Sequence, residues 1–194
     1  VSGNYNELDS IQVDKIKQWI AAGNTLVTIG AASKWAIEKK LVDEKLIEAP
    51  KEKDSLKPIE RMPYVDASEN IGKEQVGGAI FNVNLDITHP LAFGYTNETL
   101  PIYKNNNVFL VPSKNAYSTV AKYTQDPHVD GFISEKNYTE FIKPAAALIV
   151  SKLENGRVVM FGHNPNFRGA WYGTNKLFLN ALFLGDNIAI PTPE

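Results

Sequence analysis

One segment, residues 161–175, gathers many of the side chains in this sequence that could do chemistry. It contains an imidazole, three amides, a guanidinium, three glycines and the adjacent aromatic pair Trp171 and Tyr172. An imidazole can act as an acid or a base, and aromatic rings can stack on a sugar. The candidate ligand-binding residues are His163, Asn164, Asn166, Arg168, Trp171 and Tyr172. A loop held by its own hydrogen bonds, with the aromatic rings folded inward, is the alternative interpretation.

Ser33 is the hydroxyl that could act as a nucleophile. It follows the β-branched run 25–29 across a tight turn, Gly30-Ala31-Ala32, that leads into a helix from Ser33 to Leu41. A sharp strand-to-helix turn can expose a nucleophile at the edge of a sheet, and His163 would then serve as its base. The alternative is that Ser33 caps the helix, and this interpretation is favoured.

Composition excludes several kinds of site. The 194 residues include no cysteine, which rules out disulfides, thiolate metal sites and a cysteine nucleophile. The three histidines lack a second histidine or a glutamate at helical spacing, and no glycine-rich phosphate loop follows a strand. We therefore expect neither a metal nor a cofactor. The 20 basic and 22 acidic residues predict no nucleic-acid partner, and no apolar run is long enough to predict a membrane span.

The first forty residues predict an α/β fold. Asp9 or Ser10 can cap an amphipathic helix over residues 10–22, which Gly23 ends. The strand Thr25–Ile29 and the helix Ser33 to Leu41 follow with short connections. This rhythm is typical of a parallel sheet, and the length fits a single domain over residues 1–194.

The remaining chain is less regular. Residues 42–76, rich in proline and charge, are predicted to form a surface excursion, and residues 186–194 a loose tail. The Asn155-Gly156 pair predicts an antiparallel hairpin, and Asn175 to Leu184 an apolar helix buried against its own sheet or another subunit or domain. Short helices are expected at Tyr117 to Tyr123 and Glu135 to Phe141. Further strands are predicted at 79–86, 102–103, 108–111, 146–150 and 157–161.

Four blocks together resemble a known domain. They are residues 19–27 (WIAAGNTLV), 86–95 (DITHPLAFGY), 162–168 (GHNPNFR) and 171–181 (WYGTNKLFLNA). In this order they resemble the C-terminal class I glutamine amidotransferase-like domain of bacterial zinc carboxypeptidase-like proteins. The last block is fairly specific, whereas the first is common in amidotransferase-like domains.

The resemblance implies a flavodoxin-like three-layer sandwich with a mainly parallel sheet and an antiparallel hairpin near the C-terminus. Because Val1-Ser2-Gly3 looks like the tail of a strand, the first one or two β-α units are expected to be missing or supplied by another part of the parent protein. The resemblance also implies export to the periplasm or outside the cell. The implied partner is the peptidase domain of the same parent chain or another subunit.

Departures from the family pattern determine the expected function. An amidotransferase of this type needs a cysteine at the elbow and a His-x-Glu pair, but here Ala31, Ala32 and Ser33 form the elbow and no glutamate follows His163. We therefore expect a non-catalytic accessory domain that acts by docking or by binding a small-molecule or glycan ligand. The alternatives are a degenerate hydrolase that uses Ser33 and His163, and a carbohydrate-binding module.

Overall fold

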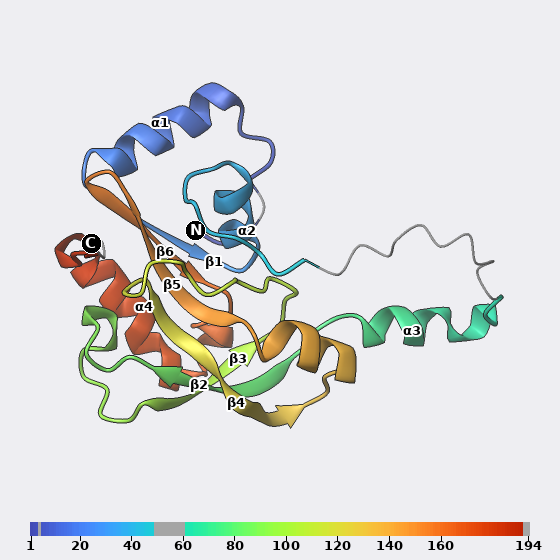
Figure 1. Cartoon of the computed structure of the whole chain (residues 1–194). Coiled ribbons are helices and arrows are strands. Elements are labelled where there is room, and N and C mark those ends of the chain that lie inside the picture. The colour runs from blue at the N-terminus through green and yellow to red at the C-terminus, as the bar shows by residue number, and fades with distance from the viewer. Residues whose placement is uncertain (4, 49–60, 192–194) are drawn as a thin grey trace.

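A computed structural model describes residues 1–3, 5–48 and 61–191, which form a six-stranded sheet with helices on both faces (Figure 1). The α-helices are α1 (Ser10–Ala21), α2 (Ala31–Glu38), α3 (Ala67–Lys73) and α4 (Tyr172–Leu184). The strands are β1 (Thr25–Ile29), β2 (Ala79–Leu85), β3 (Thr99–Lys104), β4 (Thr119–Gly131), β5 (Ala146–Leu153) and β6 (Gly156–Phe161). Short 3₁₀ or π turns are η1 (Tyr64–Asp66), η2 (Pro90–Ala92), η3 (Asn137–Ile142), η4 (Phe167–Gly169) and η5 (Gly185–Asn187).

The sheet is mostly antiparallel. Its order is β1-β6-β5-β4-β2-β3, and among the described strands only β1 and β6 pair in parallel. The α/β class and the predicted β5–β6 hairpin are confirmed, whereas the mainly parallel sheet is wrong and the flavodoxin-like arrangement is not confirmed. The physical reason is that the strand–helix rhythm stops after α2. A two-residue turn, Glu154-Asn155, then joins β5 to β6, and so short a turn can link only antiparallel strands.

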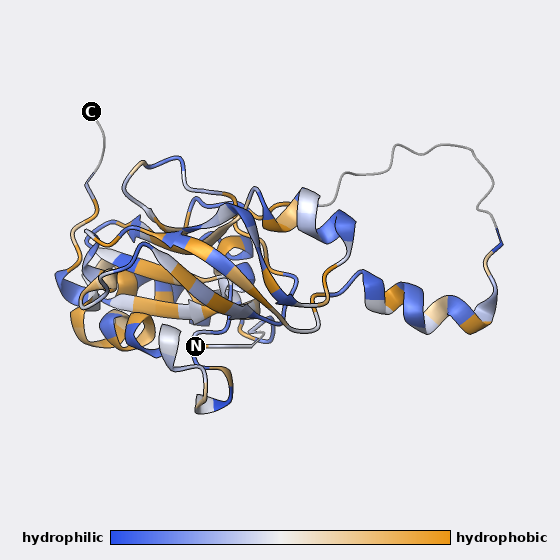
Figure 2. Ribbon diagram, turned by 90° about the horizontal axis from the view of Figure 1, so that it is seen from below, coloured by the Kyte–Doolittle hydropathy of each residue, from blue (hydrophilic) through white to orange (hydrophobic). Residues whose placement is uncertain are grey.

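Two hydrophobic cores lie on opposite faces of the sheet, which gives three layers. Alternate side chains of β6 point to different cores: Val158 packs with Ile20 of α1 and Trp35 of α2, whereas Val159 packs with Leu177 of α4. Figure 1 accordingly shows α1 and α2 on one side of the sheet and α4 on the other. In Figure 2 the strands inside the body are predominantly orange.

The N-terminal elements largely match the sequence predictions. Asp9 caps α1 in a reciprocal capping box with Gln12, as the Asp-x-x-Gln spacing favours. Strand β1 has its predicted bounds. Along the outer edge of β1, Ser2 forms a parallel bridge with Ile29.

Three predicted elements differ from the structure, whereas the short helix expected at Glu135 to Phe141 is present. Residues 117–123 do not form a helix, because Val120, Ala121 and Tyr123 are buried in strand β4 between β2 and β5. The helix expected at 33–41 is α2, which starts two residues earlier. Residues 137–142 adopt a π-helix, and Leu110 of the expected strand 108–111 forms only isolated bridges, to Leu46 and Ala146.

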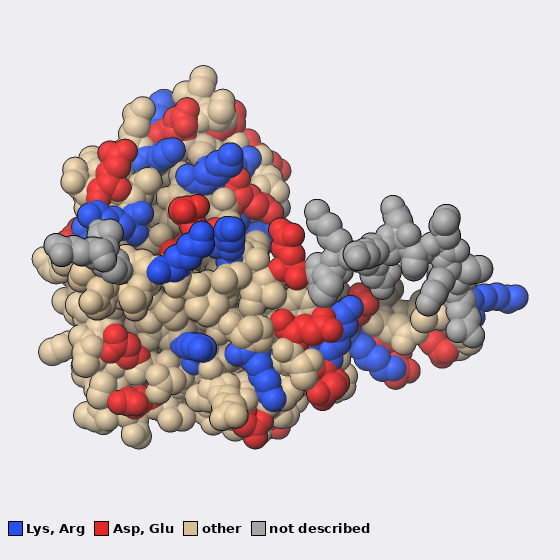
Figure 3. All heavy atoms as spheres, viewed as in Figure 1, with Lys and Arg blue, Asp and Glu red and all other residues tan. Residues whose placement is uncertain are grey.

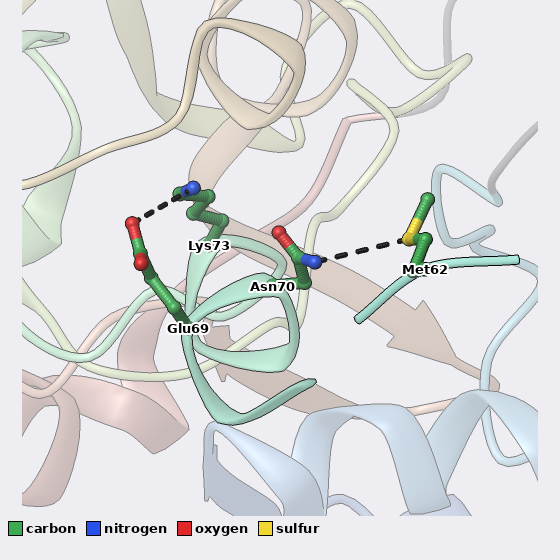
Figure 4. A network of polar contacts seen from close by, with 4 residues as sticks. All are labelled: Met62, Glu69, Asn70 and Lys73. Carbon is green, nitrogen blue, oxygen red and sulfur yellow. Dashed lines mark hydrogen bonds and ion pairs between the residues drawn. The ribbon is translucent and has the colours of Figure 1, made fainter. Parts of the chain in front are cut away.

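The excursion predicted at 42–76 begins later than expected. Val42 is buried, residues 45–47 pair with 109–111, and positions 49–60 lie outside the described residues. Helix α3 projects away from the body in Figures 1 and 2, and it alternates blue and orange in Figure 2. Its described polar side-chain contacts stay within the projection: Lys73 pairs with Glu69 at 2.9 Å, and Asn70 Nδ2 donates to Met62 Sδ at 3.8 Å (Figure 4).

The tail predicted over 186–194 is packed at its start. Ile188 is buried in the α4-side core and Ile190 packs against it, while residues 192–194 lie outside the described part of the chain. No helix in the described residues is long and apolar enough to cross a membrane.

Candidate functional site

The carboxyl ends of the parallel strands β1 and β6 meet at one edge of the sheet. The Gly30 amide, after β1, donates to the Phe161 carbonyl at 2.8 Å, and the Gly162 amide, after β6, donates to the Ala147 carbonyl at 2.9 Å. Ligands of open α/β sheets commonly bind outside such carboxyl ends. The turn that leads to Ser33 and the loop that contains His163 both begin at this edge.

Gly30 occupies the sharp turn between β1 and α2. Its backbone has φ 55° and ψ −117°, a conformation that residues other than glycine rarely adopt, and α2 begins at the next residue. A Cβ atom built on Gly30 would lie 3.4 Å from the Asn106 Nδ2. The residue at the strained elbow thus carries no side chain, and the Asn106 amide lies beside the point where the side chain of a larger residue would start.

Ser33 is neither at this elbow nor a helix cap. It lies in the first turn of α2, fully buried, where its hydroxyl is 3.0 Å from the Thr28 hydroxyl and donates to the Phe161 carbonyl at 3.2 Å. The prediction that Ser33 caps the helix is therefore wrong, because Gly30 is the N-cap residue. Its hydroxyl instead ties α2 to the ends of β1 and β6.

His163 is fully buried on the other face of the sheet. Its ring packs edge-on against Phe161 of the α4-side core, whereas Ser33 packs against Thr28 on the α1–α2 face. The His163 Nδ1 is 3.1 Å from the Ala147 carbonyl, and Nε2 has no hydrogen-bond partner in the described residues. No hydrogen bond between Ser33 and His163 appears in the described part of the chain.

The environment of His163 favours the neutral ring. Its pKa is lowered to about 4, chiefly because the ring is buried; the hydrogen bond to the Ala147 carbonyl acts in the opposite direction, and the nearby Lys104 charge contributes to the lowering. A general base that serves at neutral pH works best with a pKa near 7 and contact with its substrate. His163 meets neither condition in this conformation.

Lys104 is a buried cation that the sequence analysis did not single out. Its Nζ donates to Asn106 Oδ1 at 3.0 Å, to the Val108 carbonyl at 2.7 Å and to the Gly162 carbonyl at 2.6 Å. Burial lowers the pKa of Lys104 to about 7. The alternation of Leu100, Ile102 and Lys104 on β3 places the lysine on the inward face, and this spacing was the available signal.

The loop between β6 and α4, residues 162–171, folds against strand β3. Its Asn164 amide donates to the Tyr103 carbonyl at 3.1 Å, and the Phe167 ring stacks on Tyr103 with centroids 3.8 Å apart. The Trp171 indole Nε1 donates to the Pro101 carbonyl at 3.3 Å. These contacts hold the loop against β3, whereas the neighbouring Tyr172 ring is 78% exposed and does not fold inward.

The six predicted ligand-binding residues are thus not equally accessible. Asn164 accepts a hydrogen bond from the Asn166 amide at 3.2 Å, and both residues are half-buried, as is Trp171. Arg168 is exposed, with a strained φ of 52°, and Tyr172 is 78% exposed. The structure therefore leaves Arg168 and Tyr172 as the side chains that a ligand can reach most easily.

Two grooves lie beside this edge rather than at the loop. One, of about 770 Å³, runs along Lys34 and Ile37 of α2, and another, of about 650 Å³, lies next to α3 and η3. They share Ile47, Asn107 and Phe109. Within residues 1–3, 5–48 and 61–191, no group of three or more histidine, aspartate or glutamate side chains is placed to hold a metal ion.

Comparisons with known proteins support the fold. No protein-family model and no curated protein matches the chain. A solved ThuA-like protein from Bacteroides uniformis is similar over 93% of this chain and 65% of its own, with a TM-score of 0.52 and 13% identity. One from Parabacteroides merdae is similar over 99% of this chain and 71% of its own, again with a TM-score of 0.52 and 13% identity.

A GMP synthase subunit-like protein from Thermoplasma acidophilum matches with a TM-score of 0.49 and 11% identity, over 92% of this chain and 67% of its own. The chain thus spans about two thirds of the length of these structures. None of the comparisons supports the link to zinc carboxypeptidases. The chain shares its fold with the two ThuA-like structures, and that fold is a glutamine amidotransferase-like α/β fold.

Proposed function

We propose that the chain is a non-catalytic accessory domain that acts by binding. The observation that carries this proposal is Gly30 at the strand-to-helix elbow. In folds that place a nucleophile at such a turn, the strained residue supplies the reactive atom. Glycine supplies none, so covalent catalysis at this edge lacks its first component.

The alternative of a Ser33–His163 hydrolase has little support from the geometry. Both side chains are fully buried, they pack on opposite faces of the sheet, and the Ser33 hydroxyl is committed to Thr28 and Phe161. The low pKa of His163 also disfavours proton transfer at neutral pH.

A hydrolase assay tests this proposal. We expect the purified chain to release no product from glutamine or from p-nitrophenyl esters. If product is released, Ser33→Ala and His163→Asn are compared with Ser151→Ala, which removes another buried serine, on β5. Loss of activity in the first two variants with retention in the third would establish the hydrolase and overturn the proposal.

The β6–α4 loop is the proposed recognition segment, for a small-molecule or glycan ligand. Tyr172 offers an exposed ring and Arg168 an exposed guanidinium, a pairing that suits a polar ring such as a sugar. The carbohydrate-binding module remains the second candidate because of this exposed tyrosine. An extracellular location and a zinc-peptidase partner are proposals that rest on the resemblance of the four sequence blocks alone.

Affinity electrophoresis in gels containing xylan, β-glucan or pectin distinguishes these candidates. A carbohydrate-binding module is retarded by at least one polysaccharide, and Tyr172→Ala abolishes the retardation. Tyr117→Ala, which removes an exposed tyrosine elsewhere on the surface, is the matched control. If no gel retards the unaltered chain, the glycan candidate is refuted.

A further inference from the structure

Helix α4 presents an apolar outer face with few charges. Its inner side chains Leu177 and Ala181 are buried against the sheet, whereas Leu179, Leu182 and Phe183 are 47%, 54% and 78% exposed. Lys176 is the one charged residue of α4. On the face that Figure 3 presents, lysine, arginine, aspartate and glutamate side chains gather over the upper part of the molecule, whereas the lower part is mostly tan. Exposed apolar side chains grouped on one helix face are typical of an interaction surface.

A second aromatic side chain enlarges this face. Phe93, 72% exposed, follows η2, and the Asn180 amide of α4 donates to the Leu91 carbonyl at 2.7 Å and the Phe93 carbonyl at 3.0 Å. The α4 outer face therefore comprises Phe93, Leu179, Leu182 and Phe183, held on a fixed backbone.

Opposite charges lie at the two ends of this face. Lys176 stands one turn before Leu179, and Asp186, in η5, follows Phe183 by three residues. Both residues are exposed, and neither has a partner of opposite charge in the described part of the chain. The Lys176 Nζ donates to the Gly94 carbonyl and Asp186 accepts from the Thr25 hydroxyl, so each charge is held near its end of the helix.

This arrangement is self-complementary. If two copies of α4 pack their outer faces antiparallel, with the two-fold axis level with position 181 along the helix, Lys176 of one copy lies opposite Asp186 of the other. The same register places Leu179 of one copy opposite Phe183 of the other. A two-fold axis repeats both pairs, as an isologous interface requires. The apolar pair and the charged pair are therefore both matched in the same antiparallel register.

We propose that the α4 outer face binds a second copy of this chain in an antiparallel, two-fold symmetric dimer. This surface is separate from the β6–α4 loop, so the proposal stands whether or not that loop binds a ligand. One helix and one neighbouring phenylalanine form a contact smaller than a standard stable interface, so the dimer is expected to be weak and concentration-dependent.

Sedimentation velocity over a range from micromolar to submillimolar protein tests the dimer. We expect the unaltered chain to shift from monomer to dimer as its concentration rises. Phe183→Glu, which places a charge within the α4 outer face, should raise the dimer dissociation constant about tenfold or more. Phe132→Glu makes the same change at another phenylalanine, which is 63% exposed beyond β4, and should leave the constant unchanged. Circular dichroism verifies that both variants fold.

Charge reversal tests the register and the identity of the partner. Lys176→Glu or Asp186→Lys alone brings like charges together and should weaken the dimer several-fold, whereas the double variant should recover it. A chain that stays monomeric at every concentration overturns the proposal, and so does a dimer insensitive to Phe183→Glu. Single reversals without effect, or a double variant weaker than both singles, overturn the antiparallel register.

Discussion

The buried imidazole of His163 predicts a loss of stability in mild acid. Above about pH 6.5 the ring is neutral in both the folded and the unfolded chain, so it contributes no pH dependence. As the pH falls below 6.5 the unfolded chain takes up a proton, while the folded chain resists it until about pH 4. The folded state therefore loses stability between these two values.

The size of this loss follows from the difference between the two pKa values. A difference of about 2.5 at roughly 1.4 kcal/mol per unit corresponds to about 3 kcal/mol. This is a large fraction of the 5–15 kcal/mol (roughly) that holds a typical domain folded. Full burial of the ring means that solvent screening does not reduce the figure.

Urea unfolding of the unaltered chain and of His163→Asn between pH 4 and pH 7.5 measures this effect. Asparagine can still donate to the Ala147 carbonyl but does not titrate in this range. We expect the difference in free energy of unfolding between the two proteins to shift by about 3 kcal/mol toward the variant as the pH falls. His128→Asn, which removes an exposed histidine, is the control.

A constant difference across this range would refute the reasoning, because the imidazole would then titrate alike in both states. The NMR titration of the His163 ring protons provides an independent readout. A midpoint near 6.5 would show that the ring is accessible, and it would also weaken the argument against a catalytic role.

Three further predictions concern backbone and charge. Gly156→Ala would place a Cβ 1.8 Å from the Ile20 carbonyl oxygen, so we expect urea unfolding to show a free energy of unfolding lower by about 3 kcal/mol or more. Gly72→Ala is the control: it has open space around it and should leave the free energy of unfolding unchanged or raise it. Lys104→Met removes a buried ammonium group whose pKa is about 7 in the folded chain and 10.5 in the free amino acid, so the parent is less stable at low pH than at high pH. The free energy of unfolding of the variant minus that of the parent should therefore be most favourable below pH 7 and decline as the pH rises toward 10. A difference that does not change with pH would contradict this. Arg168→Gly relieves a left-handed backbone and should raise the thermal midpoint by an amount equivalent to about 1 kcal/mol. A fall in the midpoint would contradict this expectation.

Local signals in the sequence predicted the elements that local interactions define. The Asp9 cap and the β-branched run of β1 each act within a few residues, and both elements appear where expected. The hairpin predicted from Asn155-Gly156 is also present, although its two-residue turn is Glu154-Asn155 and Gly156 is the first residue of β6. Strand β4 was missed because its hydrogen bonds come from β2 and β5, which are distant in sequence. The antiparallel pairing of β2, β3, β4 and β5 was also missed, because it depends on segments that are distant in sequence.

The site was predicted in outline but not in detail. The sequence identified the strand-to-helix turn, yet it placed the critical residue at Ser33 rather than Gly30, because a helix start is uncertain by one or two residues. The burial of Lys104 could have been predicted, because Leu100, Ile102 and Lys104 alternate along β3 on the same face of the strand. The separation of Ser33 and His163 onto opposite faces depends on how α2 and the β6–α4 loop pack, which no short segment encodes.

The parallel pairing of β1 with β6 has a consequence for how the chain folds. Thr28 and Val159, which meet across this pair, are 131 residues apart, whereas β5 and β6 are joined by two residues. Closing so long a loop costs more entropy than forming a hairpin, and contacts of high sequence separation slow folding. The β5–β6 hairpin can therefore form early and present its free edge as a template. The segment α1–β1–α2 then adds to that edge in a later, slower step.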